Sequence, residues 1–433
     1  MKWIYKIHQW VSLACAVFLL VLCFTGLPLI FRHEIAAWNS VDHAVSCPLP
    51  NVALWDGMAD GMDMVAQQYP QKMVRAISAN AEQGTLFFRV QDKGRLQLTK
   101  GRMRMGGEQL IYNVANHSLV NRDQREVRFP LIAACMRDLH LLHVQLGLGR
   151  IGRSLLGVMC LLGLAAILSG LWLYGPFMQN KAFGDIQKGS WRSCCSDWHK
   201  FISIPVFAWA FLLCLSGAMI VLYSLSYDSY MREAQADAIA HFSHRMAGSS
   251  AEPLSIALEK VQEQYSEQVV QSVELPVEDG DMYRFYLAPR YEKLDYFMAP
   301  QLVFLPAEGG EFFQAPQPWY LPLASVFLNL HIHNHGTVLL RILWSAYGLF
   351  MIGMVASGIA LWFTRWYNRV YPKRIVSLRK PEENMWRLPC YCGVLSLIGL
   401  IAPLYGALGE AVGAAALLLP FFLLWEQQRR SRL

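Results

Sequence analysis

The sequence is poor in charged residues and lacks the motifs of several large protein classes. Only 16% of its 433 residues are charged and 54% are hydrophobic, which lies outside the range of soluble globular proteins and indicates a membrane protein. The net charge of +6 is too small and too scattered to indicate nucleic acid binding. The chain also has no nucleophile constellation, phosphate-binding loop or dinucleotide fingerprint.

Ten cysteines are present, but no CxxC motif occurs. This absence excludes a zinc ribbon, a thioredoxin-type redox pair and a CxxCH site for covalent haem. Any haem bound by this chain is therefore expected to be non-covalent. Cys47 and Cys135 are the only cysteines in the two long hydrophilic stretches, where they either pair or stay free, because the sequence gives no distance between them.

Long apolar runs are frequent instead. About 20 apolar residues cross a hydrocarbon layer of about 30 Å, and we expect six spans at 11–30, 154–174, 201–223, 339–363, 388–405 and 407–425. The last two are so close in sequence that they predict a helical hairpin. The first run lacks a small-x-small cleavage site, so we expect an uncleaved span rather than a signal peptide.

Lysine and arginine are concentrated near the C-terminus, and such residues favour the cytoplasmic side. Six spans then place both termini in the cytoplasm and both long hydrophilic stretches outside. The predicted order is span 1–31, outer domain 32–150, span 151–175, cytoplasmic loop 176–200, span 201–223, outer domain 224–338, span 339–363, basic loop 364–387, hairpin 388–425 and cytoplasmic tail 426–433.

Each outer stretch has the pattern of a small α+β domain. An amphipathic helix is predicted at 53–69 and strands at 85–90, 95–99 and 109–114. The second stretch has the same order, with a helix at 253–265 and strands at 269–275, 282–287 and 301–305. The predicted fold class is an α-helical membrane protein with about six transmembrane helices and two small α+β domains.

An internal repeat is the most informative pattern. In both halves a histidine precedes a Ser/Thr-Gly pair by 17 residues, namely His8 before Thr25-Gly26 and His199 before Ser216-Gly217. A second histidine precedes an arginine by 10 residues and a Ser-Gly pair by 26, namely His143 before Arg153 and Ser169-Gly170, and His331 before Arg341 and Ser357-Gly358. We predict a two-fold repeat of span, outer domain and span, with the hairpin appended.

The repeated histidines form two sets on opposite sides of the membrane. His8 and His199 lie at the cytoplasmic mouths of their spans, and His143 and His331 lie at the outer ends. Two imidazoles that face each other across a bundle hold a b-type haem iron with both axial positions filled, which suits electron transfer. We therefore expect two non-covalent b-type haems, one near each face. The competing interpretation is that these are interfacial polar side chains without a ligand.

Other histidines leave the outer ligands open. His140 lies one helical turn before His143, and His333 and His335 closely follow His331, so any of these three could replace a ligand. No role is assigned to the histidines in the outer domains, which are His33, His43, His117, His241 and His244.

The position of His143 also bears on the helix that follows it. His143 lies 11 residues before Ser154, or about 16 Å along a continuous helix. Either the helix is tilted, or it bends at Gly147, Gly149 and Gly152, or the apolar segment begins earlier than 154.

Three arginines lie on the predicted outer side, where positive residues are unusual. Arg150, Arg153 and Arg341 are candidates for binding haem propionates or an anionic ferric chelate. The alternative is that they anchor the chain to lipid headgroups.

Several local sequences resemble a known family. They are His8-Gln-Trp before a span that ends in Thr25-Gly26, Leu142-His143-Val-Gln-Leu146 with Gly149 and Gly152-Arg153, and Ser169-Gly170-Leu171-Trp172. Residues 1–175, and more loosely 195–366, resemble the PepSY-associated transmembrane family, with each outer stretch similar to a PepSY domain. The segment Leu330-His331-Ile-His333-Asn-His335-Gly336 departs from the family's glycine pattern, which leaves open which histidine is the ligand.

The resemblance implies a function. The family includes iron-regulated membrane proteins and ferric-siderophore reductases of the bacterial inner membrane, so it implies a di-haem protein that moves electrons from the cytoplasmic side to a periplasmic ferric siderophore. Hard oxygen donors favour ferric over ferrous iron, so one electron releases the metal. The loop at 176–200 is too short for a nicotinamide or flavin domain, so the electron donor is expected to be a separate cytoplasmic protein or a quinol.

Two other classes of function fit the sequence less directly. One is a non-redox membrane anchor or regulator whose outer domains bind a peptide or a protease. The other is a transporter of iron chelates or haem, which is expected to carry polar or charged residues within its spans. A reduced absorbance spectrum separates the redox interpretation from both.

Overall fold

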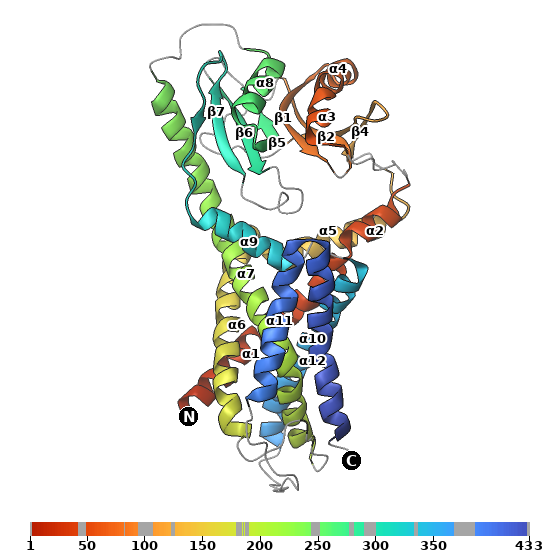
Figure 1. Ribbon diagram of the computed structural model, residues 1–433, viewed down its shortest axis with the longest axis vertical. Coiled ribbons are helices and arrows are strands. Elements are labelled where there is room, and N and C mark those ends of the chain that lie inside the picture. The colour runs from red at the N-terminus through yellow and green to blue at the C-terminus, as the bar shows by residue number, and fades with distance from the viewer. Residues whose placement is uncertain are drawn as a thin grey trace. The chain divides into compact units, whose positions relative to one another are not determined.

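The chain folds into two compact units (Figure 1). The computed structural model describes residues 2–41, 49–81, 83–93, 107–122, 126–178, 184, 186, 190–243, 252–276, 281–289, 300–332, 337–367 and 386–430. The helical unit comprises Met1–Ile35, Leu131–Leu225 and Val326–Leu433, and the sheet unit comprises Ala36–Pro130 and Ser226–Ser325. Residues 131–150 and 326–338, which the sequence placed in outer domains, therefore belong to the helical unit.

The helical unit is a bundle of apolar helices. Among the described residues, five helices are long and apolar enough to cross a membrane. These are α1 (Lys2–Ile30), α6 (Gly149–Met178), α7 (Trp191–Phe242), α10 (Val338–Tyr367) and α12 (Ala407–Arg430). The protein is therefore a membrane protein with five candidate spans.

The sixth predicted span is shorter than expected. Its apolar run divides into α11 (Arg387–Ile401) and a 3-10 turn, Ala402–Tyr405, that contains Pro403. The 15 residues of α11 cover only about 22 Å. Proline removes a backbone donor and disfavours a continuous α-helix at this point. α11 nevertheless packs against α12, as the predicted hairpin requires.

Close packing between helices uses small residues and aromatic side chains. α1 lies against both α6 and α10, and Gly157 of α6 faces Val221 of α7. Trp209 of α7 packs edge-on against Trp344 of α10 at a centroid separation of 5.9 Å. The Tyr347 hydroxyl donates to the carbonyl of Leu417 at 3.2 Å. Buried contacts of this kind hold α7, α10 and α12 together.

The chain bends sharply before α6. α5 (Pro130–Gln145) ends just before Leu146, and Leu146, Gly147 and Gly149 all have left-handed backbone angles, with φ of 51°, 69° and 59°. A Cβ on Gly152 would lie 1.8 Å from the carbonyl oxygen of Gln145, so only glycine fits there. Of the three options that the sequence left open for this helix, the structure shows two: the chain bends, and the candidate span begins before residue 154, at Gly149. In the other half, α9 (Tyr320–Ile332) similarly precedes α10.

The sheet unit contains one antiparallel sheet of eight strands, in the order β4-β3-β2-β1-β5-β6-β7-β8 (Figure 1). The first outer stretch supplies β1 (Lys72–Asn80), β2 (Thr85–Asp92), β3 (Glu108–Asn113) and β4 (Ser118–Asn121). The second supplies β5 (Gln268–Glu274), β6 (Met282–Pro289), β7 (Gln301–Pro306) and β8 (Phe313–Gln314). β1 pairs with β5 around Ile77 and Val273. The two outer stretches, predicted as separate domains, thus share one sheet.

Short helices cover one face of this sheet. α3 (Asn51–Asp56), α4 (Met58–Gln68) and α8 (Leu254–Gln264) contribute apolar side chains to a core with the strands. Gly57 divides the predicted helix 53–69 into α3 and α4. The Trp55 indole donates to the carbonyl of Val270 at 2.9 Å and so links the two stretches. α2 (Arg32–Asn39) begins in the helical unit and continues into this unit from Ala36, and the predicted strand 95–99 lies outside the described residues.

Candidate functional site

The four repeated histidines all lie on helices of the helical unit, where each is half-buried. His8 is on α1, His199 on α7, His143 on α5 and His331 on α9. α5 and α9 are the short helices that precede α6 and α10. The bend after α5 is therefore what frees His143 from the axis of the long helix that follows it.

The two outer histidines come together from opposite halves of the chain. The ring centroids of His143 and His331 are 6.2 Å apart, and their planes are inclined by 58°. Of the two predicted pairs, the outer one thus consists of rings that are neighbours in the structure.

A hydroxyl group holds each outer imidazole by Nδ1. His143 Nδ1 lies 3.0 Å from Thr25 Oγ1, and His331 Nδ1 lies 2.8 Å from Ser216 Oγ. Both hydroxyls donate their single hydrogen to a carbonyl of their own helix, at 2.7 Å for Thr25 and 3.1 Å for Ser216. A hydroxyl oxygen whose hydrogen is used in this way can accept from Nδ1–H, and this arrangement leaves Nε2 with a free lone pair.

The inner imidazoles are held in the same way. His8 Nδ1 donates to the Ala166 carbonyl at 2.9 Å and lies 3.1 Å from Ser169 Oγ. His199 Nδ1 donates to the Met354 carbonyl and lies near Ser357 Oγ, both at 3.0 Å. Because a carbonyl can only accept, Nδ1 carries the proton in both rings. In all four histidines, Nε2 is the nitrogen that can bind a metal.

Glycine lies beside each of these hydroxyl residues. A Cβ added to Gly26 would lie 3.1 Å from Cε1 of His143, and one on Gly170 would lie 2.9 Å from Cε1 of His8. Ordinary contacts of a Cβ begin at 3.4 Å. The ring edges therefore occupy space that any other residue would fill.

Burial keeps the outer imidazoles neutral. It lowers the pKa of His143 and the pKa of His331 to about 4, and the neighbouring imidazole or His140 adds to this effect. Both rings lie on helices outside the five candidate spans. A neutral imidazole is the form that binds a metal ion.

The three alternative outer ligands are His140, His333 and His335, and the structure describes only the first of them. His140 is exposed on α5, where desolvation and the charge of Arg32 lower its pKa. His333 and His335 lie outside the described residues. Of the outer histidines that the structure describes, only His143 and His331 form a ring pair.

The three outer arginines have different surroundings. Arg153 donates to Ser224 Oγ at 2.7 Å and to Gln145 Oε1 at 3.4 Å, and both partners are neutral. Arg341 forms an ion pair with Glu34. Arg150 is exposed. The positive charge of Arg153 is thus less compensated by its partners than that of Arg341.

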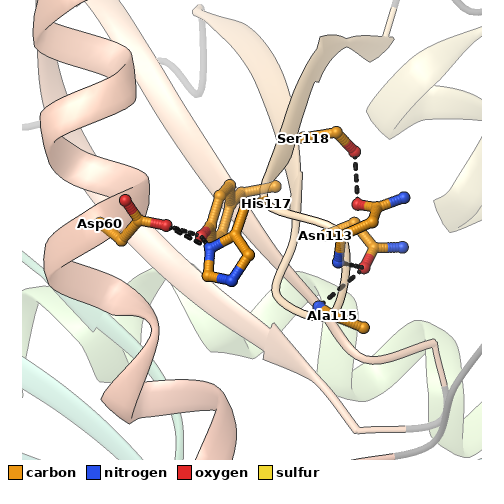
Figure 2. A network of polar contacts seen from close by, with 7 residues as sticks. Asp60, Asn113, Ala115, His117 and Ser118 are labelled. Atoms are coloured by element: carbon orange, nitrogen blue, oxygen red, sulfur yellow. Dashed lines mark hydrogen bonds and ion pairs between the residues drawn. The ribbon is translucent and has the colours of Figure 1, made fainter.

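A second polar cluster occurs in the sheet unit and includes His117, for which the sequence analysis predicted no role. Figure 2 shows Asp60 of α4 beside His117 in the turn between β3 and β4. Asp60 Oδ2 accepts from His117 Nδ1 at 2.6 Å and from the Tyr112 hydroxyl. The Tyr112 bond, followed by the His117 bond, holds the pKa of Asp60 below its usual value. Burial, followed by Asp60, raises the pKa of Tyr112.

Asn113 and His117 shape the turn that carries this cluster. Asn113 Oδ1 accepts from the backbone N–H of Ala115 at 3.0 Å (Figure 2). His117 has a left-handed φ of 51°, which histidine adopts more readily than most residues. The cluster therefore ties α4 to the β3–β4 turn. Among the described residues, no group of three or more His, Cys, Asp or Glu side chains could hold a metal ion.

Sequence reasoning did not identify the hydroxyl residues as partners of the histidines. Their signal was present, because the 17- and 26-residue spacings that define the repeat end at Ser/Thr-Gly pairs. The remaining sequence candidate, the Cys47–Cys135 disulfide, stays a prediction, since Cys135 is exposed on α5 and Cys47 lies outside the described residues.

Comparison with known proteins gives one clear relationship. No curated protein matches the chain. The PepSY-associated TM region family matches residues 5–365, which include all four histidines and their hydroxyl partners. Since this match covers most of the chain, the protein belongs to the PepSY-associated TM region family.

Proposed function

We propose that the protein is a di-haem reductase of the bacterial inner membrane that passes electrons from the cytoplasmic side to a periplasmic ferric siderophore. One observation carries the proposal. The outer imidazoles, with Nδ1–H already bonded to Thr25 and Ser216, have ring centroids 6.2 Å apart. Each pair would hold one b-type haem.

The spacing of the outer rings fits one iron between them. Two metal–nitrogen bonds of about 2.0 Å, with about 1 Å from each nitrogen to its ring centre, give a centroid separation of about 6 Å. The observed 6.2 Å agrees with this sum. A bound b-type haem supplies one-electron transfer at its iron. In each pair, two neutral imidazoles would hold the iron, and the hydrogen bonds of their Nδ1 atoms would fix the orientation of the rings.

The proposed reaction needs no group of the chain to break a bond. One electron from a cytoplasmic protein or a quinol reduces Fe(III) in the siderophore to Fe(II), which hard oxygen donors hold more weakly. Arg153 is better placed than Arg341 to attract an anionic chelate or a haem propionate, because the partners of Arg153 are neutral whereas Arg341 pairs with Glu34.

The proposed orientation has both termini in the cytoplasm and the sheet unit in the periplasm. It requires an even number of crossings, so α11 must complete the sixth. Its 15 residues give about 22 Å, and the four residues of the 3-10 turn add about 8 Å. Together they reach the roughly 30 Å of the hydrocarbon core. With six crossings, each half of the chain would have one histidine and one Ser/Thr-Gly pair near each membrane face.

Absorbance spectroscopy of the purified protein tests the proposal. We expect a dithionite-reduced spectrum of b-type haem and two haems per chain. His143→Ala and His331→Ala should remove the same haem, and His8→Ala and His199→Ala should remove the other. His241→Ala, in the sheet unit, is a matched control that should retain both.

Two results would redirect the proposal. Protein without haem would favour the non-redox anchor or regulator, or a transporter of iron chelates or haem. Haem that is not oxidised by any ferric siderophore added on the periplasmic side would leave an electron carrier with a different acceptor.

A further inference from the structure

Every histidine proposed to bind iron rests on the same two-residue structure, a hydroxyl residue followed by glycine. The four pairs are Thr25-Gly26, Ser169-Gly170, Ser216-Gly217 and Ser357-Gly358. We propose that these pairs are positioning sites that set the rotation and proton location of the iron-binding imidazoles, and thereby the redox potentials of the haems. This inference rests on the proposed function.

The hydroxyl is oriented by its own helix before it meets the imidazole. Thr25 donates to Val21 at 2.7 Å, and Ser357 donates to Met354 at 2.7 Å. A hydroxyl has one hydrogen and two lone pairs, so this intrahelical bond turns a lone pair toward the ring. The hydroxyl therefore acts as a fixed acceptor for Nδ1–H.

In the first half of the chain the glycine also makes room for the imidazole against the helix backbone, whereas in the second half an added Cβ would make only an ordinary contact with the ring. The distance from an added Cβ to Cε1 of the ring increases from 2.9 Å at Gly170 and 3.1 Å at Gly26 to 3.4 Å at Gly358 and 3.7 Å at Gly217. Cε1 lies between the two ring nitrogens. A side chain at the tightest of these positions would therefore push Nε2 away from its place as well as Nδ1.

The positioning contacts lie within one half of the chain, whereas the ring pair joins the two halves. Thr25 of α1 holds His143 of α5, and Ser169 of α6 in turn holds His8 of α1. His8 and Thr25 are 17 residues apart on one helix, a separation of about 25 Å. Each half of the chain thus positions two histidines by its own hydroxyl residues, one histidine of the inner pair and one of the outer pair.

The hydrogen bond from Nδ1–H also acts on the iron. A ligating imidazole that donates its other N–H is a more basic ligand, and a more basic ligand stabilises the ferric state more than the ferrous state. Loss of the acceptor should therefore raise the midpoint potential of that haem. A rotated ring should also change the low-field electron paramagnetic resonance signal, which depends on the angle between the two imidazole planes.

Substitution of the outer hydroxyls in the full-length protein tests the proposal. Thr25→Val removes the hydroxyl next to His143 and keeps the shape of the side chain, whereas Thr25→Ser keeps a hydroxyl there. Ser216→Ala removes the hydroxyl next to His331. Thr364→Val is the matched control, because Thr364 makes the same intrahelical bond, to Leu361 at 3.2 Å.

We expect Thr25→Val and Ser216→Ala to shift one haem and leave the other unchanged. The reduced-to-oxidised ratio of that haem at a fixed potential should rise about fivefold, as expected for one hydrogen bond, or about 40 mV at 59 mV per tenfold. Its paramagnetic signal should move. Thr25→Ser should return both readouts to wild type, and Thr364→Val should change neither.

The inference and the proposed function fail in different ways. Wild-type protein with two haems, loss of one haem in His143→Ala, and unchanged potentials and signals in Thr25→Val and Ser216→Ala would overturn the positioning role alone. Loss of haem in both Thr25→Val and Thr25→Ser would also count against the positioning role. Wild-type protein without haem would overturn the proposed function and the inference with it.

Discussion

Adding a methyl group beside an inner histidine should displace its ring from the proposed haem iron. A Cβ at Gly170 would lie 2.9 Å from Cε1 of His8, whereas ordinary Cβ contacts begin at 3.4 Å. The ring in Gly170→Ala must therefore retreat by about 0.5 Å. Metal sites tolerate only about 0.2 Å in ligand distance, so this retreat is large enough to weaken or break one axial bond.

The equivalent glycine in the other half is the matched control. A Cβ at Gly358 would lie 3.4 Å from Cε1 of His199, which is an ordinary contact. Gly358→Ala should thus keep both haems, although it makes the same chemical change beside the other ligand of the same proposed haem.

Stability alone does not separate these variants. Alanine is favoured over glycine by about 1 kcal/mol inside a helix, whereas overpacking costs about 1–3 kcal/mol. Gly170→Ala should therefore be destabilised by only about 0–2 kcal/mol, and Gly358→Ala should be stabilised slightly. Haem content is the sharper readout.

The assay is the haem-to-protein ratio and the reduced spectrum of each variant, purified in the same detergent. We expect Gly170→Ala to lose the inner haem or to show it with one axial ligand. Gly393→Ala, at a site where an added Cβ meets nothing within 4 Å, checks for general effects of alanine. Equal haem loss in Gly170→Ala and Gly358→Ala would refute the argument from ring spacing.

Three further predictions concern the sheet unit and the outer side. Because the hydrogen bond from Tyr112 helps to hold the pKa of Asp60 below its ordinary value, the ionised carboxylate stabilises the fold above about pH 4 and loses this effect as the pH falls through the lowered pKa. Asp60→Asn should accordingly lower the unfolding temperature at pH 7, and a difference that persists undiminished in acid would contradict this. Arg153→Gln should slow haem oxidation by external ferric siderophore about tenfold, as expected for one hydrogen bond to a charged group. Arg341→Gln should slow it less, and unchanged rates in both would make these residues headgroup anchors. His140→Ala should retain both haems, because His140 is exposed, and loss of one would make it a ligand.

Local pattern was enough to predict most of the helices and strands. Apolar runs predicted the five candidate spans, because a span must present apolar side chains to lipid over its whole length. Alternation of apolar and polar residues predicted β2 and β6 almost to their ends. The same local reading missed the break in the apolar run at 388–405, where α11 ends at Ile401 and a 3-10 turn that contains Pro403 follows.

The candidate ligands were also visible in the sequence, since His8, His143, His199 and His331 stand at repeated spacings. Their partners were not. Whether Thr25 faces an imidazole depends on the bend after α5, where Leu146 takes a left-handed φ of 51° that its residue type does not favour.

The joining of the two outer stretches was likewise decided in three dimensions. β1 and β5 pair through backbone groups of Ile77 and Val273, which lie almost 200 residues apart. Backbone N–H and C=O groups are the same in every strand, so no side-chain pattern marks which edge will meet which. Spans and strands depend on interactions with near neighbours and with solvent, so the local sequence predicts them. The pairing of distant groups depends on the folded chain bringing them together, so the local sequence does not predict it.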